Sequence, residues 1–183
     1  DSLKAYYRRA IAYSKLGDYK QTIRDLDTFI NLASKVYFPY NSDTTTLKTE
    51  DIGDNLDIEL YKPLIISAVY MAYLERSAAY TKLGKFHEAI QDSTKAIEIN
   101  PKEPKGYNYR AAVYFAQNDF QKAIENFSQG ITANPDSYEL YGRRGSVYLK
   151  IGKNKEAIRD FQQAARLGDQ RSQEFLKAKG IKW

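Results

Sequence analysis

The chain has 183 residues, 43% of them apolar and 28% charged, and its 28 lysines and arginines exceed its 23 acidic residues to give a net charge of +5. It contains no cysteine, which excludes disulfides and thiol chemistry, and no apolar run approaches membrane-spanning length. No signal peptide is recognisable, but the chain starts at Asp1 without a methionine, which is compatible with removal of an upstream segment, so the localisation is left open.

One short pattern recurs four times along the chain. It consists of a tyrosine, an arginine three residues later, a small residue, and a second tyrosine three residues after that, at residues 6–13, 73–80, 107–114 and 141–148. The last three copies begin 34 residues apart. Units repeated at a fixed period stack on their neighbours and present one long surface. The sequence therefore predicts a repeat protein whose function is to hold another molecule.

Each unit is predicted to contain two amphipathic helices. In the third copy, apolar residues at helical spacing precede and follow a polar break at residues 117–119. The corresponding breaks elsewhere contain Gly17, Gly84 and Gly152, and glycine readily adopts the left-handed conformation that a tight helix-to-helix turn needs. Asn118 takes this place in the third unit, and asparagine tolerates the same conformation. Neither helix could bury its apolar face alone, so the pairs must stack.

The repeat resembles the tetratricopeptide repeat (TPR) family in its bacterial type. The resemblance rests on the 34-residue period, on Pro101 and Pro135 at unit ends, and on small residues at Ala10, Ser77, Ala89, Ala111, Ala123, Gly145 and Ala157. It implies an all-α, right-handed α-solenoid of helix-turn-helix repeats, with units at residues 3–36, 70–103, 104–137 and 138–171. The array ends where Asp169 replaces the unit-ending proline and can cap a short helix, so residues 172–183 are expected to form a C-terminal cap.

Residues 37–69 interrupt the period, because Gly17 and Gly84 are 67 residues apart. A degenerate repeat is one explanation, but three threonines at 44–46 and two prolines favour a long loop. The helix before the loop is expected to overrun to Tyr37, and the next helix to start early at Pro63. Residues 37–61 carry a net charge of −5, which leaves +10 on the remainder. A solvated acidic loop and a lid over a basic groove are both compatible with this charge.

The arginine of each unit recurs with an acidic or amide residue 16 positions later. In an antiparallel helix pair, residues at this separation lie at about the same height, and a partly buried arginine needs a partner that satisfies its planar fork. We therefore predict structural pairs within each unit, not ligand contacts: Arg9 with Asp25, Arg76 with Asp92, Arg110 with Asn126 and Arg144 with Asp160.

In TPR arrays, the face of each first helix that points away from its own second helix lines the concave surface. The resemblance places an apolar and aromatic strip with basic flanks on this face, and such residues anchor protein interfaces. A peptide or helix of a partner protein with acidic and apolar residues would complement it. The candidate partner-binding residues are Tyr7, Arg8, Ile11, Lys15, Leu74, Ala78, Lys82, Lys105, Asn108, Tyr109, Ala112, Phe115, Arg143, Ser146, Leu149 and Lys150.

TPR domains that bind the acidic tails of heat-shock chaperones use a carboxylate clamp of lysine, asparagine and arginine. Here Leu74 and Ala78 stand where the clamp would need lysine and asparagine, and Tyr109 stands where it would need asparagine. Arg143 alone fits the clamp. Binding of a chaperone tail is therefore not expected.

Other classes of function have less support. The only histidine, His87, is predicted to face solvent, no spacing suggests a metal site and no glycine-rich loop could hold phosphate, so no catalytic residue, metal or cofactor is expected. Nucleic-acid binding through the basic face is an alternative, but the excess charge is small and the aromatic residues form no regular stacking series. Self-assembly through the uncapped end before Leu3 is a second alternative.

Overall fold

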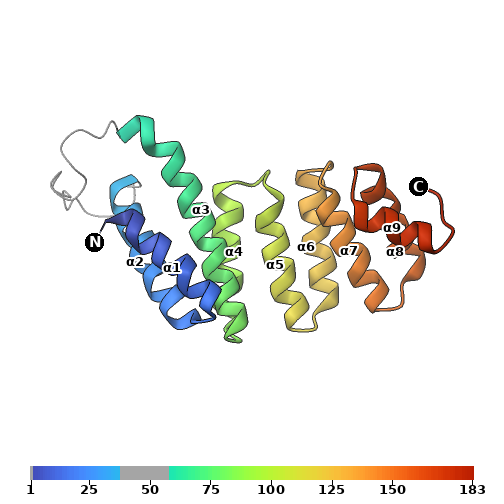
Figure 1. Cartoon of the computed structure of the whole chain (residues 1–183), viewed down its shortest axis with the longest axis horizontal. Coiled ribbons are helices and arrows are strands. Elements are labelled where there is room, and N and C mark those ends of the chain that lie inside the picture. The colour runs from blue at the N-terminus through green and yellow to red at the C-terminus, as the bar shows by residue number, and fades with distance from the viewer. Residues whose placement is uncertain (1, 38–57) are drawn as a thin grey trace.

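The computed structural model describes residues 2–37 and 58–183, and within these ranges it contains nine helices and no strand (Figure 1). The predicted acidic loop or lid lies almost entirely in residues 38–57, outside the described ranges. No helix in the described ranges combines the length and the apolar character needed to cross a membrane. The helices are α1 (Leu3–Leu16), α2 (Tyr19–Tyr37), α3 (Ile58–Lys82), α4 (Phe86–Ile99), α5 (Pro104–Ala116), α6 (Phe120–Ala133), α7 (Tyr138–Lys150), α8 (Asn154–Arg166) and α9 (Gln170–Ala178).

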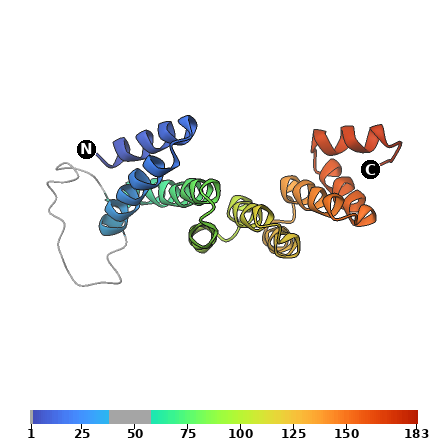
Figure 2. The same ribbon diagram turned by 90° about the horizontal axis from the view of Figure 1, so that it is seen from below.

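Consecutive helices pair, and the pairs stack in a row. The closest neighbours are α1 with α2, α3 with α4, α5 with α6 and α7 with α8, and each second helix also packs on the first helix of the next pair. Helix α9 packs on α8 at the end of the row. The all-α solenoid with a C-terminal capping helix is thus confirmed. The row is curved, and α1 and α9 both rise on the same side of it (Figure 2).

The turns within the pairs have the predicted left-handed residues. Gly17, Gly84 and Gly152 have φ angles of 78°, 72° and 78°, and Asn118 has a φ of 61°. In every unit this conformation lets the next backbone N–H return to the carbonyl of the second repeated tyrosine, which satisfies an acceptor at the end of the first helix. These bonds run from Asp18 to Tyr13, Lys85 to Tyr80, Asp119 to Tyr114 and Lys153 to Tyr148, at 2.9–3.0 Å.

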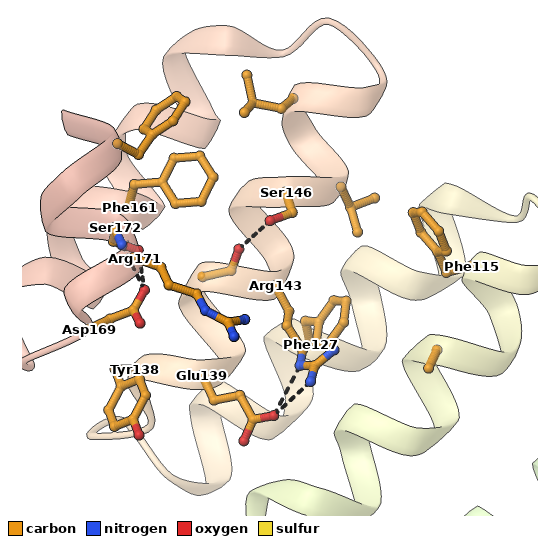
Figure 3. A pocket seen from close by; sticks show the side chains of 15 residues that line it. Phe115, Phe127, Tyr138, Glu139, Arg143, Ser146, Phe161, Asp169, Arg171 and Ser172 are labelled. Carbon is orange, nitrogen blue, oxygen red and sulfur yellow. Dashed lines mark hydrogen bonds and ion pairs between the residues drawn. The ribbon is translucent and has the colours of Figure 1, made fainter. Parts of the chain in front are cut away.

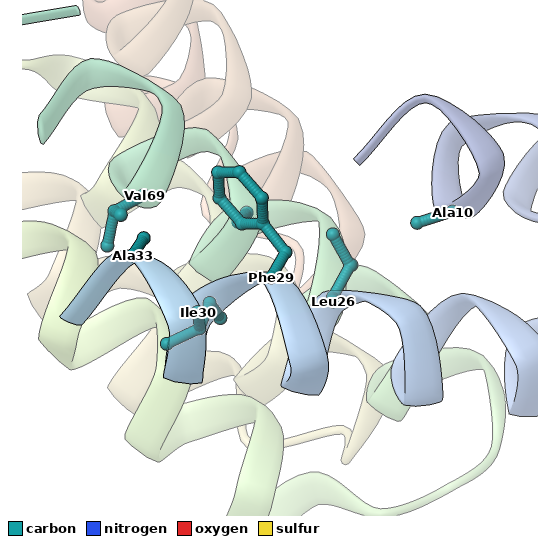
Figure 4. Close-up of a cluster of buried hydrophobic side chains, with 7 residues drawn as sticks. Ala10, Leu26, Phe29, Ile30, Ala33 and Val69 are labelled. Carbon is teal, nitrogen blue, oxygen red and sulfur yellow. The ribbon is translucent and has the colours of Figure 1, made fainter. Parts of the chain in front are cut away.

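Small side chains let the two helices of a unit approach closely. The predicted small residues Ala10, Ser77, Ala111 and Gly145 are all buried. A Cβ atom on Gly145 would lie only 3.2 Å from the Cβ of Asp160, so this position has no room for a larger side chain. Around Ala10, the first core joins α1, α2 and α3 through Leu26, Phe29, Ile30, Ala33 and Val69 (Figure 4).

The predicted arginine pairs form in all four units. Arg9, Arg76 and Arg144 each donate two hydrogen bonds of 2.7–2.8 Å to the aspartate 16 residues later, and Arg110 donates to Asn126. In the last three units the guanidinium also reaches the second helix of the preceding unit, which the sequence had not indicated. These bonds run from Arg76 to Asp27 (2.6 Å), from Arg110 to Thr94 (3.2 Å) and from Arg144 to Ser128 (2.8 Å). Each of these arginines therefore ties three helices together.

Helices α2 and α3 are longer than their counterparts. Helix α2 reaches Tyr37, as the apolar spacing predicts, and α3 has 25 residues where α5 has 13. The predicted start at Pro63 is wrong, because α3 begins at Ile58 and Pro63 lies inside it. Proline lacks the N–H that would bond one turn back, but this costs a single backbone bond close to the helix end.

The capping helix forms at the C-terminal end as predicted, although α9 begins at Gln170, two residues before the expected segment. Asp169 caps it by accepting a hydrogen bond of 3.1 Å from the Ser172 N–H. Leu176 is fully buried, and the Phe175 ring lies 4.7 Å from that of Phe161. The last helix pair is therefore covered by apolar contacts.

The bridging arginines should differ in their contribution to stability. Arg76→Ala leaves the buried Asp92 carboxylate unpaired and is expected to cost about 3–5 kcal/mol of unfolding free energy. Arg110→Ala leaves only neutral acceptors and is expected to cost about 1–2 kcal/mol. Urea unfolding followed by circular dichroism measures both, with Arg8→Ala on an exposed side chain as the control. Equal losses for Arg76→Ala and Arg110→Ala would contradict this account.

Candidate functional site

The concave side of the array is formed by the first helices. In Figure 2 the row is curved, and α1 and α9 rise at its two ends on the same side, which is called the hollow of the array below. Direct contacts between α1 and α3, α3 and α5, and α5 and α7 make this side continuous. The candidate residues come from these first helices.

A cavity of about 760 Å³ lies in the C-terminal half of this hollow (Figure 3). Helices α5, α7 and α9 provide its walls, and rings and aliphatic side chains provide most of its apolar lining. Phe115, Tyr138 and Leu149 are among the most exposed large apolar side chains of the described residues, at 38%, 49% and 37%. The other residues of the lining are Ala112, Phe127, Glu139, Gly142, Arg143, Ser146, Val147, Phe161, Asp169, Arg171, Ser172 and Phe175.

Two arginines border the cavity, and they differ in their partners. Arg143 forms an exposed ion pair with Glu139, one turn earlier on α7: its Nε donates a hydrogen bond of 3.0 Å to Glu139 Oε1, and its Nη2 lies 3.0 Å from the same oxygen. Glu139 also accepts a bond of 3.1 Å from the Asn108 amide. Arg171 on α9 is exposed and has no hydrogen bond or ion pair within the described residues. An anionic group in the cavity would therefore find a free guanidinium at Arg171.

Next to the cavity, a cation contacts two aromatic rings, of which Phe115 belongs to the lining. Lys150 Nζ lies 6.0 Å from the ring centre of Phe115 and 5.7 Å from that of Phe120. The two rings meet edge to face, with their centres 5.4 Å apart. A cation over a ring face is attracted to it. These contacts hold Lys150 beside the apolar lining.

The structure brings five of the candidate residues into this cavity: Ala112, Phe115, Arg143, Ser146 and Leu149. Two others do not belong to the accessible surface. Leu74 is fully buried and packs with Tyr70 and Ala96, because α4 and α5 close over this side of α3. Asn108 is only 7% exposed and is occupied with Glu139. The remaining candidates, Tyr7, Arg8, Ile11, Lys15, Ala78, Lys82, Lys105, Tyr109 and Lys150, keep partial or full exposure.

Sequence reasoning missed the part of the wall that comes from α9. Arg171, Ser172 and Phe175 line the cavity, although the sequence predicts only a cap for this segment. The repeat order itself indicates this wall, because the helix that follows a unit's second helix always takes the place of a first helix. Tyr138, at the start of α7, also lines the cavity and is not among the candidate residues.

A second group lies in the middle of the concave side. Arg8, Glu75, Tyr109 and Arg143 occupy the same place on α1, α3, α5 and α7. Glu75 is partly buried and has no hydrogen bond or ion pair within the described residues. Burial raises the pKa of its carboxyl, and burial together with the charge of Glu75 raises the pKa of the Tyr7 and Tyr109 hydroxyls. These three side chains therefore lie close to one another.

The described residues contain no group of three or more histidine, cysteine, aspartate or glutamate side chains that could hold a metal ion. His87 is exposed, and its Nε2 lies 3.1 Å from the Gln91 amide nitrogen on the same helix. Of the large exposed apolar side chains in the described residues, α1 and α2 contribute Leu16 alone. Self-assembly through this end of the array stays a prediction.

Models of the tetratricopeptide repeat match residues 4–35, 104–137 and 138–167, and a further TPR repeat model matches residues 78–118. The chain belongs to the tetratricopeptide repeat family. Among solved structures, the TPR array is similar to residues 41-end of MamA from Desulfovibrio magneticus RS-1, with a TM-score of 0.62 and 17% identity over 94% of this chain and 78% of that one. At this identity the likeness concerns the fold alone.

Other proteins to which this TPR chain is similar have names that mention heat-shock proteins. The first TPR of Spaghetti (RPAP3), bound to the HSP90 peptide SRMEEVD, has a TM-score of 0.51 and 26% identity over 60% of this chain and 88% of that one. Heat shock protein STI1 of Saccharomyces cerevisiae is 46% identical over 39 residues, and Hsp70-Hsp90 organizing protein 3 of Arabidopsis thaliana is 49% identical over 37 residues. These matches span 21% and 20% of this chain but only 7% of each relative.

The unpaired Glu75 gives a pH-dependent prediction. Because burial raises its pKa in the folded state, the stability contribution of Glu75 falls as pH rises from its ordinary pKa of about 4.3 through the raised value. Glu75→Gln carries no charge to desolvate. We expect it to unfold at higher urea concentration than wild type at pH 7 and at a similar concentration at about pH 4.

Glu139→Gln is the matched control, because Glu139 has two partners in the folded state. It is expected to lose stability at pH 7. A loss of stability for Glu75→Gln at pH 7 would show that the Glu75 carboxylate is compensated in the folded protein.

Proposed function

We propose that this TPR chain is a non-enzymatic interaction scaffold that binds an extended or helical segment of a partner protein on its concave side. The cavity between α5, α7 and α9 is the observation that carries the proposal. The exposed rings of Phe115 and Tyr138 and the unpaired guanidinium of Arg171 all line it. A segment with an apolar side chain and a neighbouring aspartate or glutamate fits this combination.

Three considerations support a protein ligand. TPR arrays are interaction scaffolds, and one neighbour in structure is bound to a peptide of a partner protein. The exposed rings lie together in a hollow that is continuous across several helices, as expected for a groove that holds a peptide. The arginines that repeat with the period are engaged in the fold and do not form a ladder for a phosphate backbone.

A library of random 12-residue peptides displayed on phage tests the proposal. Wild type is expected to enrich peptides that contain aromatic or aliphatic residues next to aspartate or glutamate. Arg171→Glu is expected to weaken these peptides about tenfold, because it replaces the free cation in the cavity with an anion.

Arg159→Glu makes the same change of charge at an exposed position of α8 that does not line the cavity, and serves as the control. Fluorescence anisotropy of labelled peptides measures both variants. Equal affinities for wild type and Arg171→Glu would place the binding surface away from this cavity and reject the proposed site.

The heat-shock peptide gives a separate prediction. Leu74 is buried and Ala78 has no polar group, so the N-terminal part of the groove cannot supply the clamp's lysine and asparagine. We expect the peptide SRMEEVD to bind no more tightly than the same peptide with an amidated C-terminus. Tight binding that amidation abolishes would show that other residues of this chain grip the terminal carboxylate.

A further inference from the structure

The cavity occupies only the C-terminal half of the concave side. The other half contains Glu75, a partly buried carboxyl with no ion pair or hydrogen bond in the described residues. An anion that is removed from water without a partner is costly to stability, so such a group is uncommon unless it serves a ligand. The proposed acidic and apolar segment would not satisfy it. A different part of the bound segment must therefore pair with Glu75.

Two tyrosines with fixed rings lie beside Glu75. The Tyr7 ring on α1 packs against Phe29, with ring centres 5.2 Å apart, and Tyr109 on α5 packs against the buried cluster of Tyr70, Leu74 and Ala96. Both hydroxyls sense the charge of Glu75. A carboxylate attracts a cation through its charge, and a neighbouring aromatic ring adds to this attraction when the cation lies over its face.

The remaining charges nearby leave this place open for a cation. Arg8, in the same row on α1, makes no ion pair with Glu75. On the opposite side, Arg143 is already paired with Glu139. One helical step beyond the row, the small residues Ala78, Ala112 and Ser146 form a strip on α3, α5 and α7 where a bound backbone can approach closely.

We propose that Glu75, flanked by Tyr7 and Tyr109, receives a lysine or arginine side chain of the bound segment and so fixes the direction in which the segment lies. This inference rests on the proposed function, because it adds a second charge to the same ligand. The segment carries its basic residue over α3 and its acidic residue over α7 and α9, near Arg143 and Arg171.

The spacing of the two charges follows from the helix packing. Two contacts, from α3 to α5 and from α5 to α7, lead from the helix of Glu75 to α7, and α9 with Arg171 takes the next first-helix place. At about 8–10 Å for each of these three steps, Glu75 and Arg171 are separated by roughly 24–30 Å, or about seven to nine residues of extended chain. The ligand is thus a segment with a basic and an acidic residue about seven to nine positions apart and apolar residues between them.

The same phage library, selected in parallel on wild type and on Glu75→Gln, tests the inference. Peptides from wild type are expected to share a lysine or arginine at this spacing from the acidic residue. Peptides from Glu75→Gln are expected to keep the acidic and apolar residues and to lose the basic one. Enrichment of the basic residue by both proteins, or by neither, would overturn the role of Glu75.

A double-mutant cycle then measures the contact itself. Replacing the basic residue of a wild-type-selected peptide with glutamine is expected to weaken its binding to wild type about tenfold and to leave its binding to Glu75→Gln unchanged. Glu75→Asp keeps the charge and is expected to recover part of the affinity. Parallel losses for both proteins would show that the basic residue contacts another site.

Failure of this inference differs from failure of the proposed function. If acidic and apolar peptides depend on Arg171 but show no basic residue, the groove remains and Glu75 has no part in it. If Arg171→Glu changes nothing and no common peptide is enriched, both proposals are rejected. A peptide with the reversed sequence that binds wild type equally well would reject the fixed direction.

Discussion

The array depends on an arginine that joins two successive second helices through one first helix. Apolar packing holds the helices together, but it is non-directional and does not by itself fix how far one pair is rotated on the next. The guanidinium of Arg76 or Arg144 has a planar fork for its own aspartate and a remaining N–H for the preceding unit. It therefore sets the register within each unit and between units, and the curvature of the row follows from repeating that register.

The same contact determines which residues are left for function. Each arginine lies on the face of its first helix that is turned toward the second helices. The neighbouring tyrosines contact the guanidinium with their rings or accept the hydrogen bond of the turn with their carbonyls. The residue immediately before each arginine points to the concave side, which gives the row of Arg8, Glu75, Tyr109 and Arg143. Architecture keeps the repeated residues nearly constant, while this row changes its chemistry at every unit and can carry specificity.

Periodic features could be predicted from the sequence because the same residue pattern recurs in every copy of the repeat. The helix pairs, the turn conformation at Asn118 and the arginine pairs are of this kind. Features that depend on one particular neighbour could not be predicted. Leu74 has the expected place on its helix, but the approach of α4 and α5 buries it. Likewise, Pro63 signals a helix start locally, yet α3 begins five residues earlier, and the proline costs it a single backbone hydrogen bond.

The third unit differs from the others in the acceptors of its arginine. Arg110 bonds to Asn126, Thr94 and Gln129, all of them neutral, and burial lowers its pKa. Neutral acceptors hold a cation less strongly than carboxylates. The array is therefore most easily bent at its centre, in the third unit, whose helix α5 forms one wall of the cavity. Bending at the third unit changes the width of the groove, so a segment bound across α3, α5 and α7 would stiffen the whole array along its length.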